Sequence, residues 1–169
     1  DRQVAMVITD IRNVGWDENA FVVCQTRSRS LAEEKLKELL NAVCEIDEIS
    51  MSSLIQRAQV SNDLEYTFYR LPLSYLPSRL FGRIFEEINS KYGVFYDNYL
   101  IFGNSVGALS KYIHALQLGN NLSSDLDFHR FSEYLATRSN LCFYMNIPES
   151  LELGSRFLNA GLANKVERG

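Results

Sequence analysis

The chain has 169 residues, of which 46% are hydrophobic and 22% are charged. This composition is typical of a globular domain with a core of its own, and it excludes a disordered chain. The net charge of -4 argues against nucleic acid as a main partner, because phosphate backbones are bound by a clustered positive field.

The first predicted elements are a β-hairpin and a helix. Residues 4–9 and 20–25 are apolar, rich in β-formers and separated by turn formers, which predicts the hairpin. Apolar residues with helical spacing then predict a helix over 31–43. Ser28 or Ser30 precedes that helix, and Ser30, followed three residues later by Glu33, fits a capping box at its start.

The middle of the chain has a less regular pattern. Residues 45–63 show no clear period, and we predict them as irregular apart from a short strand over 49–54. Strict alternation then predicts a half-buried strand over 64–69. Pro77 opens a second helix. Its predicted apolar stripe consists of Leu80, Phe81, Ile84, Phe85 and Ile88.

A second hairpin leads directly into a third helix. Residues 94–96 and 99–102 flank Asp97-Asn98, two residues that tolerate positive φ and suit a tight turn. Strands joined by so short a turn are antiparallel. Because residues 4–43 and 93–118 both follow the order of hairpin and then helix, we predict a structural pseudo-repeat.

The rest of the chain completes the predicted fold. We expect a helix from about Ser124, a strand over 141–146 and a final helix. The whole is an α+β fold, a mostly antiparallel sheet of about six strands with packed helices and two hairpin-helix units. We predict a single domain over 1–169, with 1–70 and 71–169 as its candidate halves. Both ends resemble cuts within regular elements, so we expect a fragment of a longer protein.

The cysteines and histidines indicate no metal site. Cys24, Cys44 and Cys142 have no C-x-x-C spacing and cannot all pair, so we expect small buried hydrophobic residues. Only His114 and His129 are available to assist them, and we predict neither a zinc site nor a cofactor.

One catalytic pattern is present, G-x-S-x-G at 103–107. It makes Ser105 the candidate nucleophile, and Ser105, Asp125 and His129 follow in serine-acid-histidine order. However, a nucleophile elbow requires a parallel strand, and this acid and base are four apart on one predicted helix. We therefore interpret Ser105 as a helix N-cap, with anion binding at the amides of 104–107 as a weaker alternative. Gly103 is expected to let the chain turn out of the strand.

Clustered aromatic residues suggest a binding surface. The candidate ligand-binding residues are Tyr92, Tyr96, Tyr99 and Asn104. Packing in the core explains most of the aromatic side chains equally well.

Residues 96–105, Tyr96-Asp97-Asn98-Tyr99-Leu100-Ile101-Phe102-Gly103-Asn104-Ser105, followed by Ala108-Leu109, resemble a bacterial family of uncharacterised envelope proteins, the domain of unknown function 3352 family. Residues 125–135 and 139–146 resemble the next block of that family, and the likeness covers mainly 92–148. The resemblance implies a secreted, lipoprotein-like or membrane-anchored protein of the periplasm or cell surface. It implies no activity, cofactor or catalytic residue.

The expected function is that of a non-catalytic extracytoplasmic module that binds a partner or acts as a scaffold. Its partner would be an unknown protein or envelope component, and we expect membrane association only through segments outside residues 1–169. Two alternatives remain, a serine hydrolase that uses Ser105 and a small-ligand binding module at the aromatic residues.

Overall fold

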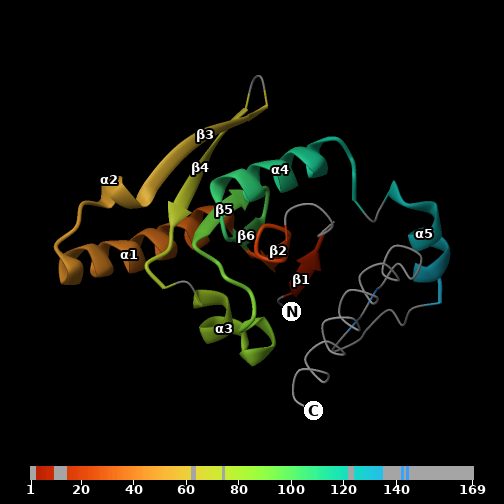
Figure 1. Ribbon diagram of the computed structural model, residues 1–169, viewed down its shortest axis with the longest axis horizontal. Coiled ribbons are helices and arrows are strands. Elements are labelled where there is room, and N and C mark those ends of the chain that lie inside the picture. Colours follow the sequence, from red (N-terminus) through yellow and green to blue (C-terminus); the bar gives the residue numbers. More distant parts are fainter. Residues whose placement is uncertain are drawn as a thin grey trace, which may run out of the picture. The chain divides into compact units, whose positions relative to one another are not determined.

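A computed structural model describes residues 3–9, 15–61, 64–73, 75–121 and 124–134, together with residues 142 and 144. The chain forms two units, Asp1–Asn121 and Leu122–Gly169. The first unit contains a six-stranded antiparallel sheet with packed helices (Figure 1). The predicted α+β fold and its mostly antiparallel sheet are therefore confirmed.

The sheet has the strand order β1-β2-β6-β5-β4-β3. Its strands are β1 (Val4–Ile8), β2 (Ala20–Gln25), β3 (Ile55–Ser61), β4 (Leu64–Arg70), β5 (Tyr92–Tyr96) and β6 (Tyr99–Gly103). The helices of the first unit are α1 (Arg29–Asp47), α2 (Met51–Leu54), α3 (Leu76–Phe81), the 3-10 helix η1 (Arg83–Phe85) and α4 (Val106–Gln117). The second unit contains α5 (Leu126–Ser132).

Three hairpins build this sheet, and a helix follows each of them. The first hairpin, β1–β2, lies at one edge, and α1 leads from it to the second hairpin, β3–β4, at the other edge. The third hairpin, β5–β6, fills the centre, where β6 pairs with β2 and β5 pairs with β4. The hairpin-then-helix order that we predict twice thus occurs a third time at β3–β4 and α3.

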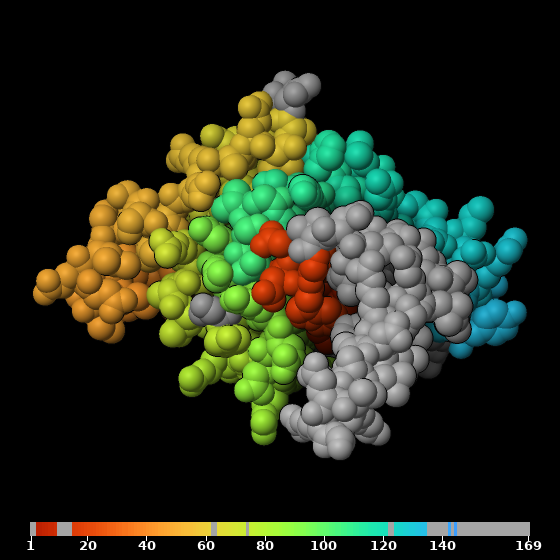
Figure 2. All heavy atoms as spheres, in the orientation of Figure 1, coloured from red at the N-terminus to blue at the C-terminus, as the bar shows by residue number. Residues whose placement is uncertain are grey.

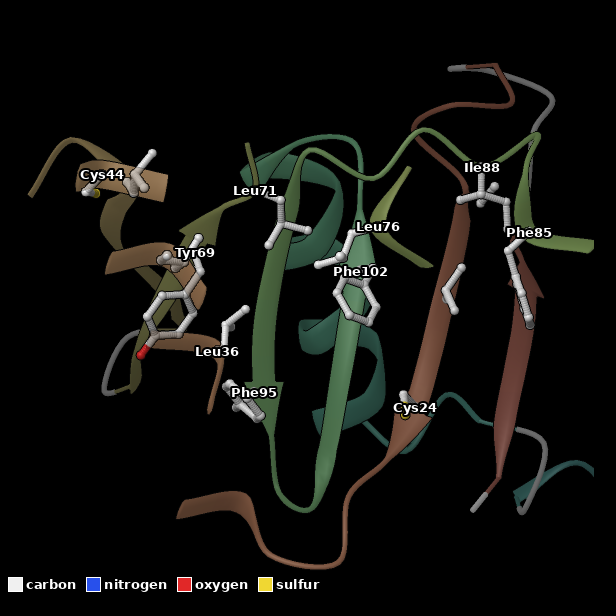
Figure 3. Close-up of a cluster of buried hydrophobic side chains, with 14 residues drawn as sticks. Cys24, Leu36, Cys44, Tyr69, Leu71, Leu76, Phe85, Ile88, Phe95 and Phe102 are labelled. Atoms are coloured by element: carbon white, nitrogen blue, oxygen red, sulfur yellow. The ribbon is translucent and has the colours of Figure 1, made fainter. Parts of the chain in front are cut away.

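Each central strand is apolar on both sides, and helices bury both faces of the sheet. In β2, Val22 lies in a core cluster with Leu40 of α1, whereas Phe21 lies in a second cluster with Leu109 of α4. Figure 3 shows the first cluster, to which Tyr69, α3 and η1 also contribute. The sheet is therefore the middle layer between α1 and α4.

The start of α1 agrees with one of the two serines predicted to precede it. Ser28 is the N-cap, and its hydroxyl accepts a hydrogen bond from the Leu31 amide at 3.4 Å. The capping box predicted from Ser30 and Glu33 is wrong. The helix begins one residue after Ser28, and the Glu33 carboxylate instead accepts a 2.6 Å hydrogen bond from the hydroxyl of Tyr69.

The segment after α1 is more regular than its sequence suggests. The strand predicted over 49–54 is wrong, because α2 occupies Met51–Leu54, with Ser50 as its N-cap. The strand β3 begins directly after it and pairs with β4 over almost its whole length. Its side chains are mostly polar because β3 lies at the sheet edge, so apolar periodicity does not reveal it.

The second predicted helix is broken at Gly82. This glycine adopts φ +106°, a conformation that ends α3, and the separate 3-10 helix η1 follows it. The predicted single stripe is therefore wrong. Phe85 and Ile88 are buried, whereas Leu80 and Ile84 are 58% and 60% exposed.

The second unit is described only around α5. Asp125 is its N-cap and accepts hydrogen bonds from the amides of Asp127 and Phe128. The predicted strand over 141–146 lies outside the described residues except for Cys142 and Tyr144. The expected burial is confirmed for Cys24 and Cys44 and is wrong for Cys142, which is exposed. A strand-like apolar pattern does not guarantee that both faces of a segment are covered.

Candidate functional site

The turn between β6 and α4 places Ser105 directly before the first residue of the helix, Val106. Its backbone is extended, with φ -139° and ψ 157°, and its hydroxyl accepts a hydrogen bond from the Ala108 amide at 3.0 Å. This is the geometry of an N-cap, and it confirms that Ser105 caps α4. The preceding strand β6 runs antiparallel to both of its neighbours, β2 and β5.

Glu18, which no sequence pattern indicates, completes this site. The Ser105 hydroxyl donates a 2.5 Å hydrogen bond to Oε2 of Glu18, and Nδ2 of Asn104 donates a 2.6 Å hydrogen bond to Oε1. One carboxylate thus joins two consecutive residues of the turn. We call these three residues, Glu18, Asn104 and Ser105, the Glu18 clip. No local signal marks Glu18, because it lies 87 positions from Ser105.

The Glu18 clip also affects the electrostatics of α4. Within α4, whose residues are all described, the first turn carries no acidic side chain. A helix N-terminus is stabilised by a nearby negative charge, because its first amides are unpaired and its dipole is positive there. Glu18 supplies that charge from the loop before β2. An anion bound at the amides of residues 104–107 would therefore lie next to the Glu18 carboxylate.

The Ser105 hydroxyl is already committed to two hydrogen bonds. A serine hydroxyl has one proton to donate and two lone pairs, and here the proton goes to Glu18 and one lone pair accepts from Ala108. His114 follows Ser105 by nine residues on α4, so it lies roughly 13 Å further along the helix axis at about 1.5 Å per residue. The other proposed triad members, Asp125 and His129, belong to the second unit.

The two glycines of G-x-S-x-G differ in their surroundings. A Cβ atom on Gly103 would lie 3.1 Å from side-chain atoms of both Leu109 and Phe21, which is closer than ordinary contact. Gly103 therefore permits α4 to pack closely on the sheet. The expectation that it turns the chain is wrong, because it is a strand residue without positive φ. A Cβ atom on Gly107 would meet only Oγ of Ser105, at 3.8 Å.

The aromatic ligand-binding candidates do not face a common pocket. Tyr92 and Tyr96 pack against the α4 side of the sheet, where Tyr96 stacks on Tyr66 with ring centroids 6.3 Å apart. Tyr99 is 39% exposed at the hairpin end of β6. Asn104 belongs to the Glu18 clip, and its Oδ1 atom is buried with no hydrogen-bond partner.

A cavity of about 260 Å³ lies between α1 and β4. Glu33 and Tyr69 meet in its wall, and Lys37 lies 2.8 Å from the Glu33 carboxylate. The hydrogen bonds from Lys37 and Tyr69 hold the pKa of Glu33 below its usual value. The pKa of the Tyr69 hydroxyl is raised, mainly by burial and also by its hydrogen bond to the Glu33 carboxylate. Lys37 and Tyr69 both bind the Glu33 carboxylate, which favours a structural role for these three residues.

A second, open cavity of about 460 Å³ lies where α1, α2, β4 and β5 meet. Tyr92 is among its lining residues, as the small-ligand alternative requires. Its ring, however, packs in the core cluster beneath α4, whereas Leu54 and Leu71 belong to the cluster on the opposite face.

Comparisons of the chain with protein-family models, with curated proteins and with solved structures find no significant match. The resemblance to the domain of unknown function 3352 family stays a prediction. Among the described residues, no group of three or more His, Cys, Asp or Glu side chains is placed to hold a metal ion. In the same part of the chain, every helix falls short of the length and apolar character that crossing a membrane requires.

Proposed function

We propose that this chain is a non-catalytic module of the bacterial cell envelope, located outside the cytoplasm, which binds a partner protein or holds a larger protein together. The observation that carries the non-catalytic part is the place of Ser105, which caps α4 after β6, a strand that runs antiparallel to both of its neighbours. A nucleophile elbow instead follows a parallel strand, and a serine triad uses a histidine base, whereas the Ser105 hydroxyl is held between Glu18 and the Ala108 amide.

The packing around the Glu18 clip supports the same proposal. Gly103 is needed for close contact with Leu109, and Asn104 and Ser105 bind Glu18, so each of these positions has a structural role. Gly107 has no close neighbour that requires a glycine. The G-x-S-x-G pattern is thus accounted for by helix packing and capping. The extracytoplasmic location rests on the family resemblance alone.

A fluorophosphonate probe tests the non-catalytic proposal. The native chain is incubated with the probe, and labelled peptides are identified by mass spectrometry, with Ser105→Ala as the matched control. We expect no labelling at Ser105. Labelling of the native chain that is lost in Ser105→Ala would refute the proposal and favour the serine hydrolase.

Localisation needs a separate measurement. The full-length protein that contains this chain is expressed in its own host, and the cells are separated into cytoplasmic, membrane and extracytoplasmic fractions. We expect the protein in the extracytoplasmic or membrane fraction, where protease added to cells with a permeabilised outer layer degrades it. Recovery in the cytoplasmic fraction, protected from that protease, contradicts the envelope location.

A further inference from the structure

The strand β1 (Val4–Ile8) lies at one edge of the sheet (Figure 1). In the part of the chain that the structure describes, β1 pairs with one strand only, β2. In Figure 2, the red atoms of the first described residues lie at the surface of the first unit. An edge strand with one partner presents N–H and C=O groups that can pair with another strand.

Hydrogen bonds at the two ends of β1 show which of its backbone groups face outward. The Gln25 amide donates to the Gln3 carbonyl at 2.9 Å, and the Thr9 amide donates to the Asn19 carbonyl at 2.8 Å. In an antiparallel pair, residues that exchange such bonds alternate with residues whose N–H and C=O groups point away from the partner strand. Gln3 and Thr9 therefore face β2. The residues of β1 that face outward are Val4, Met6 and Ile8.

The side chains of these three residues share one face of the sheet. Each is directly opposite a residue of β2 that belongs to the core cluster on the α1 side. Val4 packs against that cluster, whereas Met6 and Ile8 are 39% and 43% exposed. The same residues thus offer outward backbone groups and accessible apolar side chains, which is what a further strand of the sheet would cover.

The two edges of the sheet differ in composition. The other edge strand, β3, carries Gln56, Arg57 and Gln59, and its register with β4 shifts after Gln59. Charged side chains and bulges at an edge hinder association with another strand. All five residues of β1 are apolar, and none of them is proline. The β1 edge is therefore the one suited to accept a strand.

The symmetry of β1 identifies the partner as a second copy of the chain. If two β1 strands pair antiparallel with Met6 opposite Met6, then Val4 lies opposite Ile8, and every outward residue meets an outward residue. Each such pair exchanges two hydrogen bonds. Arg2 and Asp10, which lie outside the described residues, are each four positions from Met6 in the sequence, so the same register matches opposite charges. We propose that two copies associate through their β1 edges and form one continuous antiparallel sheet.

This inference goes beyond the proposed function, because it holds whether or not Ser105 is catalytic. An interface of one strand from each copy is small, so we expect a dissociation constant of about 10–100 µM. Sedimentation velocity of the complete 169-residue chain, at concentrations from about 5 to about 500 µM, measures the association. A monomer throughout would overturn this inference and leave the non-catalytic proposal unaffected.

One added lysine at each edge provides a matched comparison. Met6→Lys should weaken the association at least about tenfold, because the two added charges would be directly opposite each other. Gln56→Lys adds the same charge at an exposed position of β3 and should change the association less than about twofold. Circular dichroism melts check that the variants remain folded, and Ile8→Lys replaces Met6→Lys if the latter unfolds.

Cysteine cross-linking tests the register. Met6→Cys and Ile8→Cys are each made together with Cys142→Ser, which removes the exposed thiol, and are oxidised with diamide. Directly opposite residues have Cα atoms about 5.5 Å apart, which a disulfide can bridge. Met6→Cys should therefore form a cross-linked dimer. Two copies of Ile8→Cys should not, because their cysteines would be four positions out of register, roughly 13 Å apart.

Three results would overturn the proposal. One is a native chain that stays monomeric up to about 500 µM; a Met6 amide protected from hydrogen exchange in that monomer would assign the β1 edge to another segment of the same chain. Another is equal weakening by Met6→Lys and Gln56→Lys. The third is cross-linking of Ile8→Cys as fast as that of Met6→Cys, which would contradict the symmetric register.

Discussion

The hydroxyl of Ser105 donates a 2.5 Å hydrogen bond to the carboxylate of Glu18, a residue 87 positions earlier in the chain. This contact ties the loop that precedes β2 to the first turn of α4, and it gives that helix the negative charge that its own first turn lacks. Because β2 and β6 are neighbouring strands, the contact links the first hairpin to the third.

A double-mutant cycle measures the strength of this contact. We expect Glu18→Ala and Ser105→Ala each to lower the free energy of unfolding by about 1–2 kcal/mol, since each removes a hydrogen bond to a charged group or a helix cap. The double variant should lose about 1 kcal/mol less than the sum, because the two residues share one interaction. Urea denaturation is the measurement, with exposed Glu34→Ala as control. Simple additivity would contradict the contact.

Alanine at the two glycines of the G-x-S-x-G pattern should have opposite effects. Gly103→Ala is expected to destabilise the protein by about 1–3 kcal/mol, because its Cβ atom would lie 3.1 Å from Leu109 and Phe21. Gly107→Ala should stabilise it by up to about 1 kcal/mol, because alanine is the better helix former and only Oγ of Ser105 is within 4 Å. Thermal melts of both variants check this, and two changes of the same sign would refute it.

Two serines at the start of α1 distinguish the observed cap from the predicted capping box. Ser28→Ala should lower the free energy of unfolding by about 1 kcal/mol, because Ser28 accepts a hydrogen bond from the Leu31 amide. Ser30→Ala should change it by less than about 0.5 kcal/mol, because its hydroxyl contacts only that of Ser28 in the described hydrogen bonds. Urea denaturation of both variants is the test. A larger loss for Ser30→Ala would restore the capping box.

Glu33 should make stability depend on pH. Its pKa lies below the ordinary value of 4.5, first because of Lys37 and then because of Tyr69. A lowered pKa in the folded state contributes stability above the unfolded pKa, and this stability is lost as pH falls through the folded value. The difference in unfolding free energy between the native chain and Glu33→Gln should therefore be largest above about pH 5 and shrink below it.

Urea denaturation at a series of pH values measures this difference. Tyr69→Phe should show a smaller acid-dependent loss than the native chain, because it removes one donor to Glu33. Glu34→Gln is the matched control, since Glu34 is an exposed neighbour on the same helix. A difference between the native chain and Glu33→Gln that does not change between pH 7 and pH 3 contradicts the prediction.

Thiol reactivity should separate the three cysteines. Cys142 is exposed, whereas Cys24 and Cys44 are 8% and 9% exposed. A maleimide should therefore label Cys142 rapidly in the native chain, and the other two only after unfolding in urea. Mass spectrometry counts the labels, and Cys142→Ser should show no fast labelling. Fast labelling of Cys24 or Cys44 in the native state would contradict the described core.

Much of the third hairpin and its helix could be predicted because their signals are local. Asp97 adopts φ 48° in the two-residue turn, and Ser105 accepts the hydrogen bond of an amide three residues later. The helix α4 ends at Gln117, close to Gly119, which has φ 76°. A turn, a cap and a stop signal each depend on a few neighbouring residues.

Several of the predictions that are wrong concern contacts between distant residues. The edge strand β3 is held by pairing with β4, and its own apolar period is weak. The Glu33 carboxylate accepts a hydrogen bond from Tyr69, 36 positions away, and the capping box does not form. The stripe from Leu80 to Ile88 divides at Gly82, a residue that a helical pattern tolerates and that only φ identifies as a break.

The sequence by itself determined the class of fold, the tight turn at Asp97 and the cap at Ser105, because periodicity, turn chemistry and capping act over a few residues. The tertiary structure alone decided that the third hairpin fills the centre of the sheet, that Glu18 binds Ser105 and that Ile84 faces outward. These features depend on which surfaces meet after the chain has closed long loops, and no local pattern specifies those partners.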